Sequence, residues 1–207
     1  MSVKFRYPSW RSRFFLLVLP VVSLFAAAAS GQSFSNRKAD DIDPALRETL
    51  MLAVAESVSF EDRFHAEVWL TDMSNRLASQ VPNPDERLRI LRTVHQQATR
   101  TDLPPELVLA VIDVESNFDR FAISSATAIG LMQIMPFWID ELGLDGDLNL
   151  LFDIETNILL GCQILAYYLD MEDGDLLQGL ARYNGSTGQR WYGDRVIDRL
   201  RLKWFRN

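Results

Sequence analysis

Residues 105–118 read PELVLAVIDVESNF, and this stretch carries the pattern on which the fold prediction rests. Proline is tolerated in the first turn of a helix, because the N–H that it lacks would have no intrahelical partner there. Val108, Val111 and Ile112 then recur at the three- and four-residue spacing of an amphipathic helix. We therefore expect a helix over about 106–115.

Glu115 continues the apolar side of this helix, because it lies seven residues after Val108. Asp113, by contrast, is expected on the side that faces solvent. A carboxylate on an apolar face is costly to ionise, and the negative end of the helix dipole acts in the same direction, so the pKa of Glu115 should be raised. A carboxyl group that stays protonated near neutral pH can serve as a general acid. In the alternative interpretation, Glu115 sits at a frayed helix end and caps it or pairs with Arg120.

The rest of the chain shows the same signals of helix starts and the same apolar spacing. Further helices are expected from the Asp43-Pro44 start signal, over about 61–81, after Pro82-Asn83-Pro84, and over about 126–135, 154–169, 176–183 and 196–205. No segment alternates apolar and polar residues over the length of a strand. The fold class is therefore predicted to be all-α.

The N-terminus has the three-part pattern of a secretory signal. Residues 1–13 are basic, and Phe14 to Ala29 form an uncharged run of 16 residues that ends in small residues. A membrane-spanning helix needs about 20 apolar residues, so we expect a cleaved signal peptide over 1–31, with membrane anchoring as the less favoured alternative. The protein is then exported, and the periplasm is the predicted location. Residues 32–42 are small and polar and predict a linker.

The charges exclude one class of partner. Residues 32–207 carry 17 basic and 28 acidic side chains, and residues 101–207 alone carry 8 basic and 17 acidic ones. A nucleic-acid partner requires clustered Lys and Arg, which these stretches lack. We therefore expect no binding of nucleic acid.

The sequence contains few residues suited to covalent cross-links or metal binding. Its one cysteine, Cys162, cannot form an intramolecular disulfide and is expected to be a buried thiol. His65 and His95 are far apart in the sequence, so a structural zinc site is not expected. No metal or other cofactor is predicted.

Four short motifs follow one another in the second half of the chain. They are Glu115-Ser116-Asn117-Phe118, Ser124 with Gly130-Leu131-Met132-Gln133-Ile134-Met135-Pro136, Asn157-Ile158 with Gly161, and Ala181-Arg182-Tyr183-Asn184-Gly185. In this order and at these spacings they resemble the soluble lytic transglycosylase domain family of the lysozyme-like superfamily. The resemblance covers about residues 100–195, which is roughly half of the chain.

The resemblance implies a reaction and a site. Peptidoglycan glycan strands are the implied substrate, and Glu115 is the implied acid/base. The groove for the N-acetylated sugars is implied to be lined by Ser124, Gln133, Met135, Tyr183 and Asn184. These residue types suit the task, because hydroxyl and amide groups bond an acetamido group while Tyr and Met supply adaptable apolar contacts. Ser116, just past the helix, is instead expected to bond to the backbone.

Two positions depart from the family pattern. Thr127 stands where the family often has glycine, and threonine tolerates a positive φ badly. Phe137 and Trp138 follow the Met-Pro pair where a small residue and threonine are common; a place in the core is favoured over a sugar platform.

Most glycosidases use two carboxylates, but nothing in the sequence assigns a partner to Glu115. A transglycosylase does not need one, because the C6 hydroxyl of the muramic residue is a tethered nucleophile. A lysozyme-type hydrolase is the closest alternative. A non-catalytic murein-binding protein of an envelope assembly and a plain helical adaptor are two others.

The predicted organisation thus places a catalytic domain over 101–207 after an N-terminal helical region over 43–100. The apolar stripes of the N-terminal helical region need a partner, which lies either within the chain or outside it. The sequence does not identify any protein partner.

Overall fold

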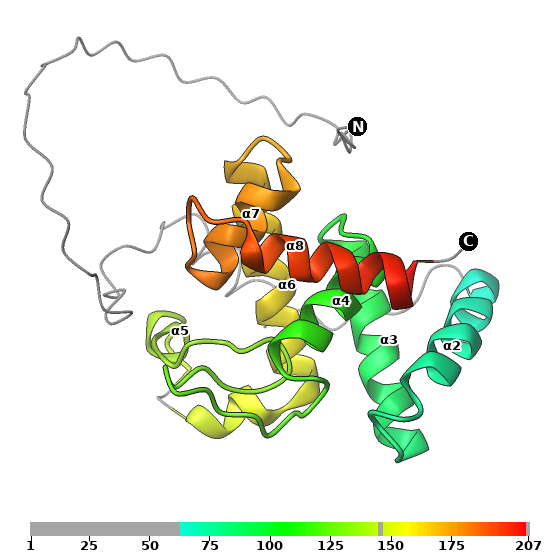
Figure 1. Ribbon diagram of the computed structural model, residues 1–207. Helices are drawn as coiled ribbons and strands as arrows, with labels where there is room; N and C mark the ends of the chain where they lie inside the picture. The colour runs from blue at the N-terminus through cyan, green and yellow to red at the C-terminus, as the bar shows by residue number, and fades with distance from the viewer. Residues whose placement is uncertain (1–62, 145–146, 206–207) are drawn as a thin grey trace, which may run out of the picture.

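The computed structural model describes residues 63–144 and 147–205, and the described part is helical (Figure 1). Its elements are α2 (Arg63–Leu77), α3 (Pro84–Arg100), α4 (Pro105–Glu115), α5 (Phe137–Glu141), the 3₁₀ helix η2 (Leu148–Phe152), α6 (Ile154–Met171), α7 (Leu176–Asn184), α8 (Trp191–Arg199) and the π-helix η3 (Leu200–Trp204). Within these residues only two isolated β-bridges occur. The prediction of an all-α fold is confirmed.

The signal peptide, the linker and the helix expected from Asp43 lie outside the described residues. Within the described residues, no helix combines the length and apolar character that a membrane span requires.

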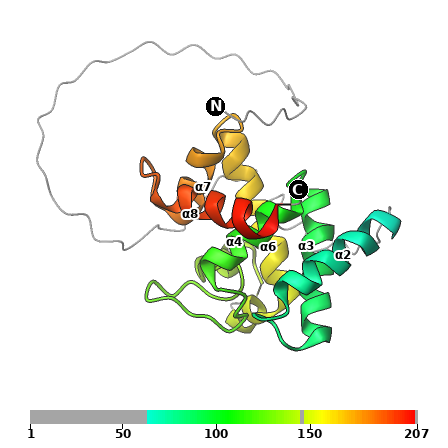
Figure 2. The ribbon, with the colours of Figure 1, turned by 45° about the vertical axis from the view of Figure 1, so that its right-hand side comes forward.

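Helix α4 is the centre of the fold, and it lies in the middle of the molecule in both ribbon views (Figures 1 and 2). It packs against α3, α8 and η3. Every residue from Leu107 to Asp113 is buried, including those on the side expected to face solvent. The exposed position predicted for Asp113 is wrong, because α8 and η3 cover that face of the helix.

Helices α2 and α3 belong to the same core as α4. The buried side of α3 carries Ile90, Leu91, Val94 and Ala98, and the helix packs against both α4 and α6. Burial of four such side chains stabilises the fold by several kcal/mol, on the order of 1.5–3 kcal/mol for each large aliphatic residue. The apolar stripe of α3 therefore finds its partner within the chain.

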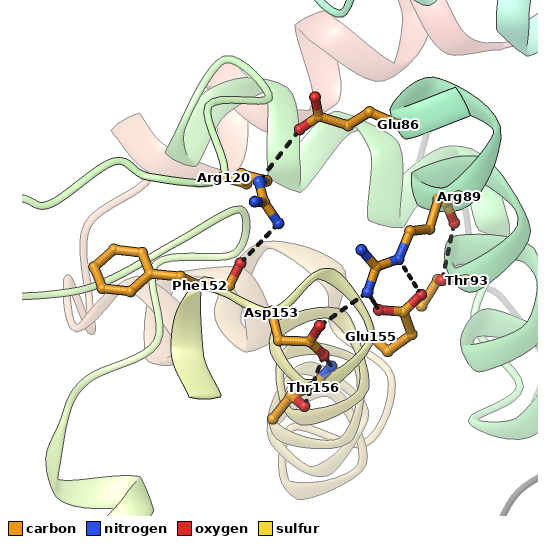
Figure 3. Close-up of polar contacts among 8 residues, drawn as sticks. All are labelled: Glu86, Arg89, Thr93, Arg120, Phe152, Asp153, Glu155 and Thr156. Carbon is orange, nitrogen blue, oxygen red and sulfur yellow. Dashed lines mark hydrogen bonds and ion pairs between the residues drawn. The ribbon is translucent and has the colours of Figure 1, made fainter. Parts of the chain in front are cut away.

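Polar contacts join α3 to the start of α6 (Figure 3). The guanidinium of Arg89 donates to Asp153 Oδ2 over 2.9 Å and to Glu155 Oε1 over 2.6 Å. Nearby, Arg120 lies 3.5 Å from the carboxylate of Glu86 and pairs with it. Because the side chains of these pairs are partly exposed to solvent, each pair contributes less than about 1 kcal/mol. The contacts of Arg89 join α3 to the start of α6, and the pair of Arg120 with Glu86 joins α3 to the loop after α4.

The helix expected over 126–135 is wrong. This segment consists of turns joined by antiparallel bridges from Ile129 to Ile123 and to Ile134. The buried side chain of Asn157, on α6, accepts from the N–H of Met132 over 2.7 Å and donates to the carbonyl of Ile129 over 2.9 Å. These tertiary hydrogen bonds use backbone groups that a helix would need for itself.

Three left-handed residues break the same segment: Thr127 at φ +68°, Gly130 at φ +80° and Gln133 at φ +51°. A Cβ at position 130 would lie 2.4 Å from Asn157 Nδ2, so the glycine is required for close approach as well as for its φ. Thr127 adopts the positive φ that threonine disfavours, where the family pattern often has glycine.

The last helix also differs from its prediction over 196–205. It begins earlier, at Trp191, and from Leu200 it widens into the π-helix η3. Trp204 is fully buried and packs against Phe118 at a ring-centroid distance of 5.5 Å. The early start matters for the site, because it adds one helical turn that contains Tyr192 and Arg195.

Two smaller predictions are confirmed. Cys162 is a buried free thiol. Trp138 is 5% exposed and belongs to the core, against which the partly buried Phe137 packs.

Candidate active site

The C-terminal end of α4 opens onto a cavity of about 440 Å³. Its lining comes from three parts of the chain: the end of α4, the loop after it, and α8. The lining residues are Asp113, Val114, Glu115, Ser116, Asn117, Ala122, Ile123, Ser124, Gln133, Arg195 and Arg199. The cavity therefore brings together residues that are up to 86 positions apart in the sequence.

Glu115 is the half-buried carboxyl group in the cavity wall. The Tyr192 hydroxyl donates a hydrogen bond of 2.6 Å to its Oε1. Burial raises the pKa of Glu115 to about 7, against the lowering effects of this hydrogen bond and of the charge of Arg195. The predicted upward shift is confirmed, and loss of solvation is its main cause.

Arg120 is not the partner of Glu115. It pairs with Glu86 and donates to the Phe152 carbonyl over 3.5 Å, as Figure 3 shows. The alternative in which Glu115 pairs with Arg120 is therefore wrong.

Ser124 and Gln133 line the cavity together with Glu115. The Ser124 hydroxyl accepts from the N–H groups of Ala126 and Ala128 over 3.2 and 3.0 Å. Because both contacts use its oxygen as an acceptor, the hydroxyl proton remains available to a ligand. Gln133 donates through Nε2 to the carbonyl of Gly130 over 3.0 Å, which holds its amide at the cavity wall.

Met135, Tyr183 and Asn184 do not line this cavity. The Tyr183 hydroxyl donates to the Met132 carbonyl over 2.8 Å. Its pKa is raised well above the usual value, first by burial and then by the negative charge of Glu115. Met135 packs against the core, and Asn184 is the last residue of α7. Their assignment as sugar contacts stays a prediction.

Ser116 bonds to the backbone, as expected. Its hydroxyl donates to the carbonyl of Leu131 over 2.8 Å and lies 3.3 Å from that of Ile112. It thus ties the end of α4 to the loop that carries Gln133.

Three site residues on α8 were missed by the sequence reasoning. Tyr192, Arg195 and Arg199 are spaced by three and four residues, so they share one face of the helix. That face meets the end of α4. The signal was present in the helical spacing from Trp191 onward, but the predicted helix began after both Tyr192 and Arg195.

Asp113 is also in the cavity wall, but its carboxylate is engaged with neighbours. It accepts from Trp204 Nε1 over 3.0 Å and from Gln80 Nε2 over 3.1 Å. Lys203 Nζ lies 3.4 Å and Arg199 Nε 3.9 Å from its oxygens. The contacts of Asp113 thus indicate a structural role. Glu115 is the other carboxyl group of the cavity wall, and it is the one suited to proton transfer.

Within the described residues, no group of three or more His, Cys, Asp or Glu side chains is arranged to hold a metal ion. What the cavity offers is one carboxyl group that exists in both protonation states near pH 7, next to hydroxyl, amide and guanidinium groups. Such a site can give a proton to a leaving group and take one from a nucleophile.

The fold and this site define the class: a lysozyme-like, all-helical domain with a single carboxyl group of raised pKa in a polar cavity. The model of the family described as Transglycosylase SLT domain matches residues 92–195. The chain belongs to this family.

Curated relatives are similar to part of the chain. A protein named "Transglycosylase" from Enterobacteria phage PRD1 is 33% identical over 101 residues, which is 49% of this chain and 36% of the relative. "Membrane-bound lytic murein transglycosylase C" of Yersinia pestis (strain Pestoides F) is 32% identical over 124 residues, covering 52% of this chain and 35% of the relative. The protein of the same name from Actinobacillus pleuropneumoniae serotype 5b (strain L20) is 46% identical over 46 residues, covering 22% and 13%. The matched region thus spans about a third or less of the length of these relatives.

Proposed function

We propose that this protein is a peptidoglycan lytic transglycosylase that cleaves the β-1,4 bond between N-acetylmuramic acid and N-acetylglucosamine, with Glu115 as the single acid/base. The observation that carries the proposal is the position of Glu115 in the cavity wall with a pKa of about 7. Membership of the SLT family and the names of the relatives support the same activity and an envelope location. The predicted signal peptide over 1–31 fits export to that compartment.

In the first step, protonated Glu115 donates its proton to the glycosidic oxygen as the bond to the anomeric carbon breaks. In the second step, the Glu115 carboxylate takes the proton of the muramic C6 hydroxyl, whose oxygen bonds to the anomeric carbon. The products are a 1,6-anhydromuramic end and a free N-acetylglucosamine C4 hydroxyl, and Glu115 returns to its starting state. Because the nucleophile is tethered to the reacting sugar, its effective concentration is high without an activated water.

The hydrogen bonds and ion pairs of Asp113 favour attack by the C6 hydroxyl over the usual mechanism with two carboxylates. Its oxygens accept from Trp204 and Gln80 and lie beside Lys203. A carboxylate held in this way is poorly placed to activate a water or to attack the sugar. In the proposal, Ser124 and Gln133 bind the N-acetyl groups from the cavity wall, while Met135, Tyr183 and Asn184 contact sugar farther along the groove.

Digestion of isolated sacculi followed by mass spectrometry tests the reaction. We expect 1,6-anhydromuramic products from the wild type and a loss of at least about a thousandfold in turnover for Glu115→Gln, since the general acid and the base are then both absent. Circular dichroism of the variant checks that its fold is retained.

Reducing-end muramic acid in place of the anhydro product would identify a lysozyme-type hydrolase. Binding without turnover by the wild type would identify a non-catalytic murein-binding protein. Full turnover by Glu115→Gln would reject Glu115 as the acid/base.

A further inference from the structure

Arg195 is a cation in the cavity wall that the fold does not use. It shares a face of α8 with Tyr192, which bonds to Glu115, and with Arg199, which lies 3.9 Å from Asp113. Arg195 itself makes no hydrogen bond or ion pair with any residue that the structure describes. Its side chain is exposed, and its guanidinium is therefore free to bind a ligand.

The cavity is locally cationic, although residues 101–207 are strongly acidic as a whole. The carboxylate of Asp113 is balanced by both Arg199 and Lys203. Glu115, with a pKa of about 7, carries at most a partial negative charge at neutral pH. Arg195 thus adds a positive charge that nothing else in the described cavity wall neutralises.

We propose that Arg195 binds a carboxylate that the substrate carries on its muramic residue, an inference that rests on the proposed function. The sugar rings of the glycan are neutral, so an anionic group must come from the lactyl ether at O3. That ether ends either in its own free carboxylate or in a peptide stem that bears carboxylates. A guanidinium suits both sources, because its planar N–H groups bind a carboxylate in a two-pronged manner.

The place of Arg195 agrees with this ligand. Arg195 and Glu115 line the same cavity, and the charge of Arg195 lowers the pKa of Glu115. The lactyl ether is attached to the same sugar whose anomeric carbon reacts. A carboxylate bound at Arg195 would therefore hold that sugar beside Glu115 and fix which side of the glycosidic bond faces the acid.

Three soluble glycan substrates test the proposal with the full chain: one with free stem-peptide carboxylates, one with the same carboxylates amidated, and one stripped of peptides so that the lactyl carboxylate is free. The kcat/KM is measured for the wild type and for Arg195→Gln. If Arg195 binds a stem carboxylate, the ratio of kcat/KM on the acidic glycan to that on the amidated glycan should fall about tenfold in the variant, as for loss of one charge-assisted hydrogen bond. If Arg195 binds the lactyl carboxylate, which is in amide linkage while the stem is present, kcat/KM on the stripped glycan should fall about tenfold and the acidic-to-amidated ratio should stay unchanged.

Arg201→Gln is the matched control, because Arg201 is an exposed arginine of η3 that does not line the cavity. Its ratio should equal that of the wild type. An unchanged acidic-to-amidated ratio in Arg195→Gln together with an unchanged kcat/KM on the stripped glycan, or an equal loss on all three glycans, would overturn the proposal.

Binding measurements test the Arg195 contact independently of whether the protein is a transglycosylase. Calorimetry compares Glu115→Gln with the double variant Glu115→Gln/Arg195→Gln on the acidic, the amidated and the stripped glycans, and no turnover is needed. A loss of affinity for the acidic or the stripped glycan that the amidated glycan does not show supports the Arg195 contact even if the wild type yields no anhydro product. Equal affinities of the two variants for both the acidic and the stripped glycans would overturn it even if the wild type is an active transglycosylase.

Discussion

The hydroxyl of Tyr192 donates a hydrogen bond of 2.6 Å to Oε1 of Glu115, across 77 positions of sequence. Tyr192 is 1% exposed, so the donor is held in place by the packing of α8. A donor on a carboxylate stabilises its ionised form and opposes the effect of burial on the pKa. The pKa of about 7 for Glu115 is thus a balance between the two.

Replacing Tyr192 by Phe should shift this balance. The hydrogen bond that lowers the pKa of Glu115 is removed while the ring remains, so the alkaline limb of the pH profile of kcat/KM should move up by roughly one pH unit. The measurement is turnover of soluble glycan from pH 4 to 10. An alkaline limb at the wild-type position would show that the hydrogen bond does not control the ionisation of Glu115.

Glu115 should also make folding stability depend on pH. Its pKa is about 7 in the folded protein and about 4.5 in the unfolded chain, so the folded state binds more protons between these values. Stability contributed by the protonated form is therefore complete below about pH 4.5 and is lost as the pH rises through 7.

Urea unfolding of the wild type and of Glu115→Gln measures this loss. The two proteins should be similarly stable at pH 4.5, and Gln should be more stable at pH 8 by roughly 2 kcal/mol, since glutamine cannot ionise. A constant difference between the two proteins across this pH range would contradict the assignment.

Asp113 should be important for stability. Asp113→Ala leaves Trp204 Nε1 and Gln80 Nε2 without their acceptor and Lys203 without its anion. We expect a loss of about 3 kcal/mol in the free energy of unfolding, measured by urea titration at pH 7. Asp194→Ala is the control, because Asp194 is an exposed acid of α8 whose pair with Arg190 contributes less than about 1 kcal/mol. Equal losses in the two variants would show that the Asp113 cluster has no special role.

Gly130→Ala should be strongly destabilising. The new Cβ would lie 2.4 Å from Asn157 Nδ2 and from the Leu151 carbonyl oxygen, at a φ of +80°. We expect a loss of roughly 3 kcal/mol or more in thermal or urea unfolding, from backbone strain and a clash together.

Gly188→Ala separates these two causes. Gly188 has a φ of +79°, but nothing lies within 4 Å of a Cβ placed there. Strain alone should then cost about 1 kcal/mol. If both variants lost the same amount, the close approach of Asn157 to the backbone at Gly130 would be irrelevant.

Helices with strong local signals were well predicted from the sequence. Proline near the start and regular apolar spacing placed the end of α4 at Glu115, where the structure also ends it. Asp175 and Asp153, which accept from backbone N–H groups at the starts of α7 and α6, are local caps of the same kind. Such signals act within a few residues, so no knowledge of distant partners is needed.

The segment over 126–135 was predicted wrongly for the opposite reason. Its composition is helical, but Asn157, more than 20 positions later, binds the backbone at Met132 and Ile129. No local sequence pattern indicates that the Asn157 side chain will compete with helical hydrogen bonds for these backbone groups. Residues in a left-handed conformation, such as Thr127 and Gln133, are stable only because this tertiary frame holds them.

In the candidate site, too, local features could be predicted from the sequence, whereas features that depend on tertiary contacts could not. Helical periodicity is a local property, so the sequence alone could place Glu115 on an apolar face and predict a raised pKa. Whether Asp113 faces solvent or core depends on α8 and η3 folding back over α4, and the hydrogen bond from Tyr192 depends on the same contact. Burial and long-range hydrogen bonds are properties of the assembled core. For that reason only the tertiary structure decides the environment of Glu115.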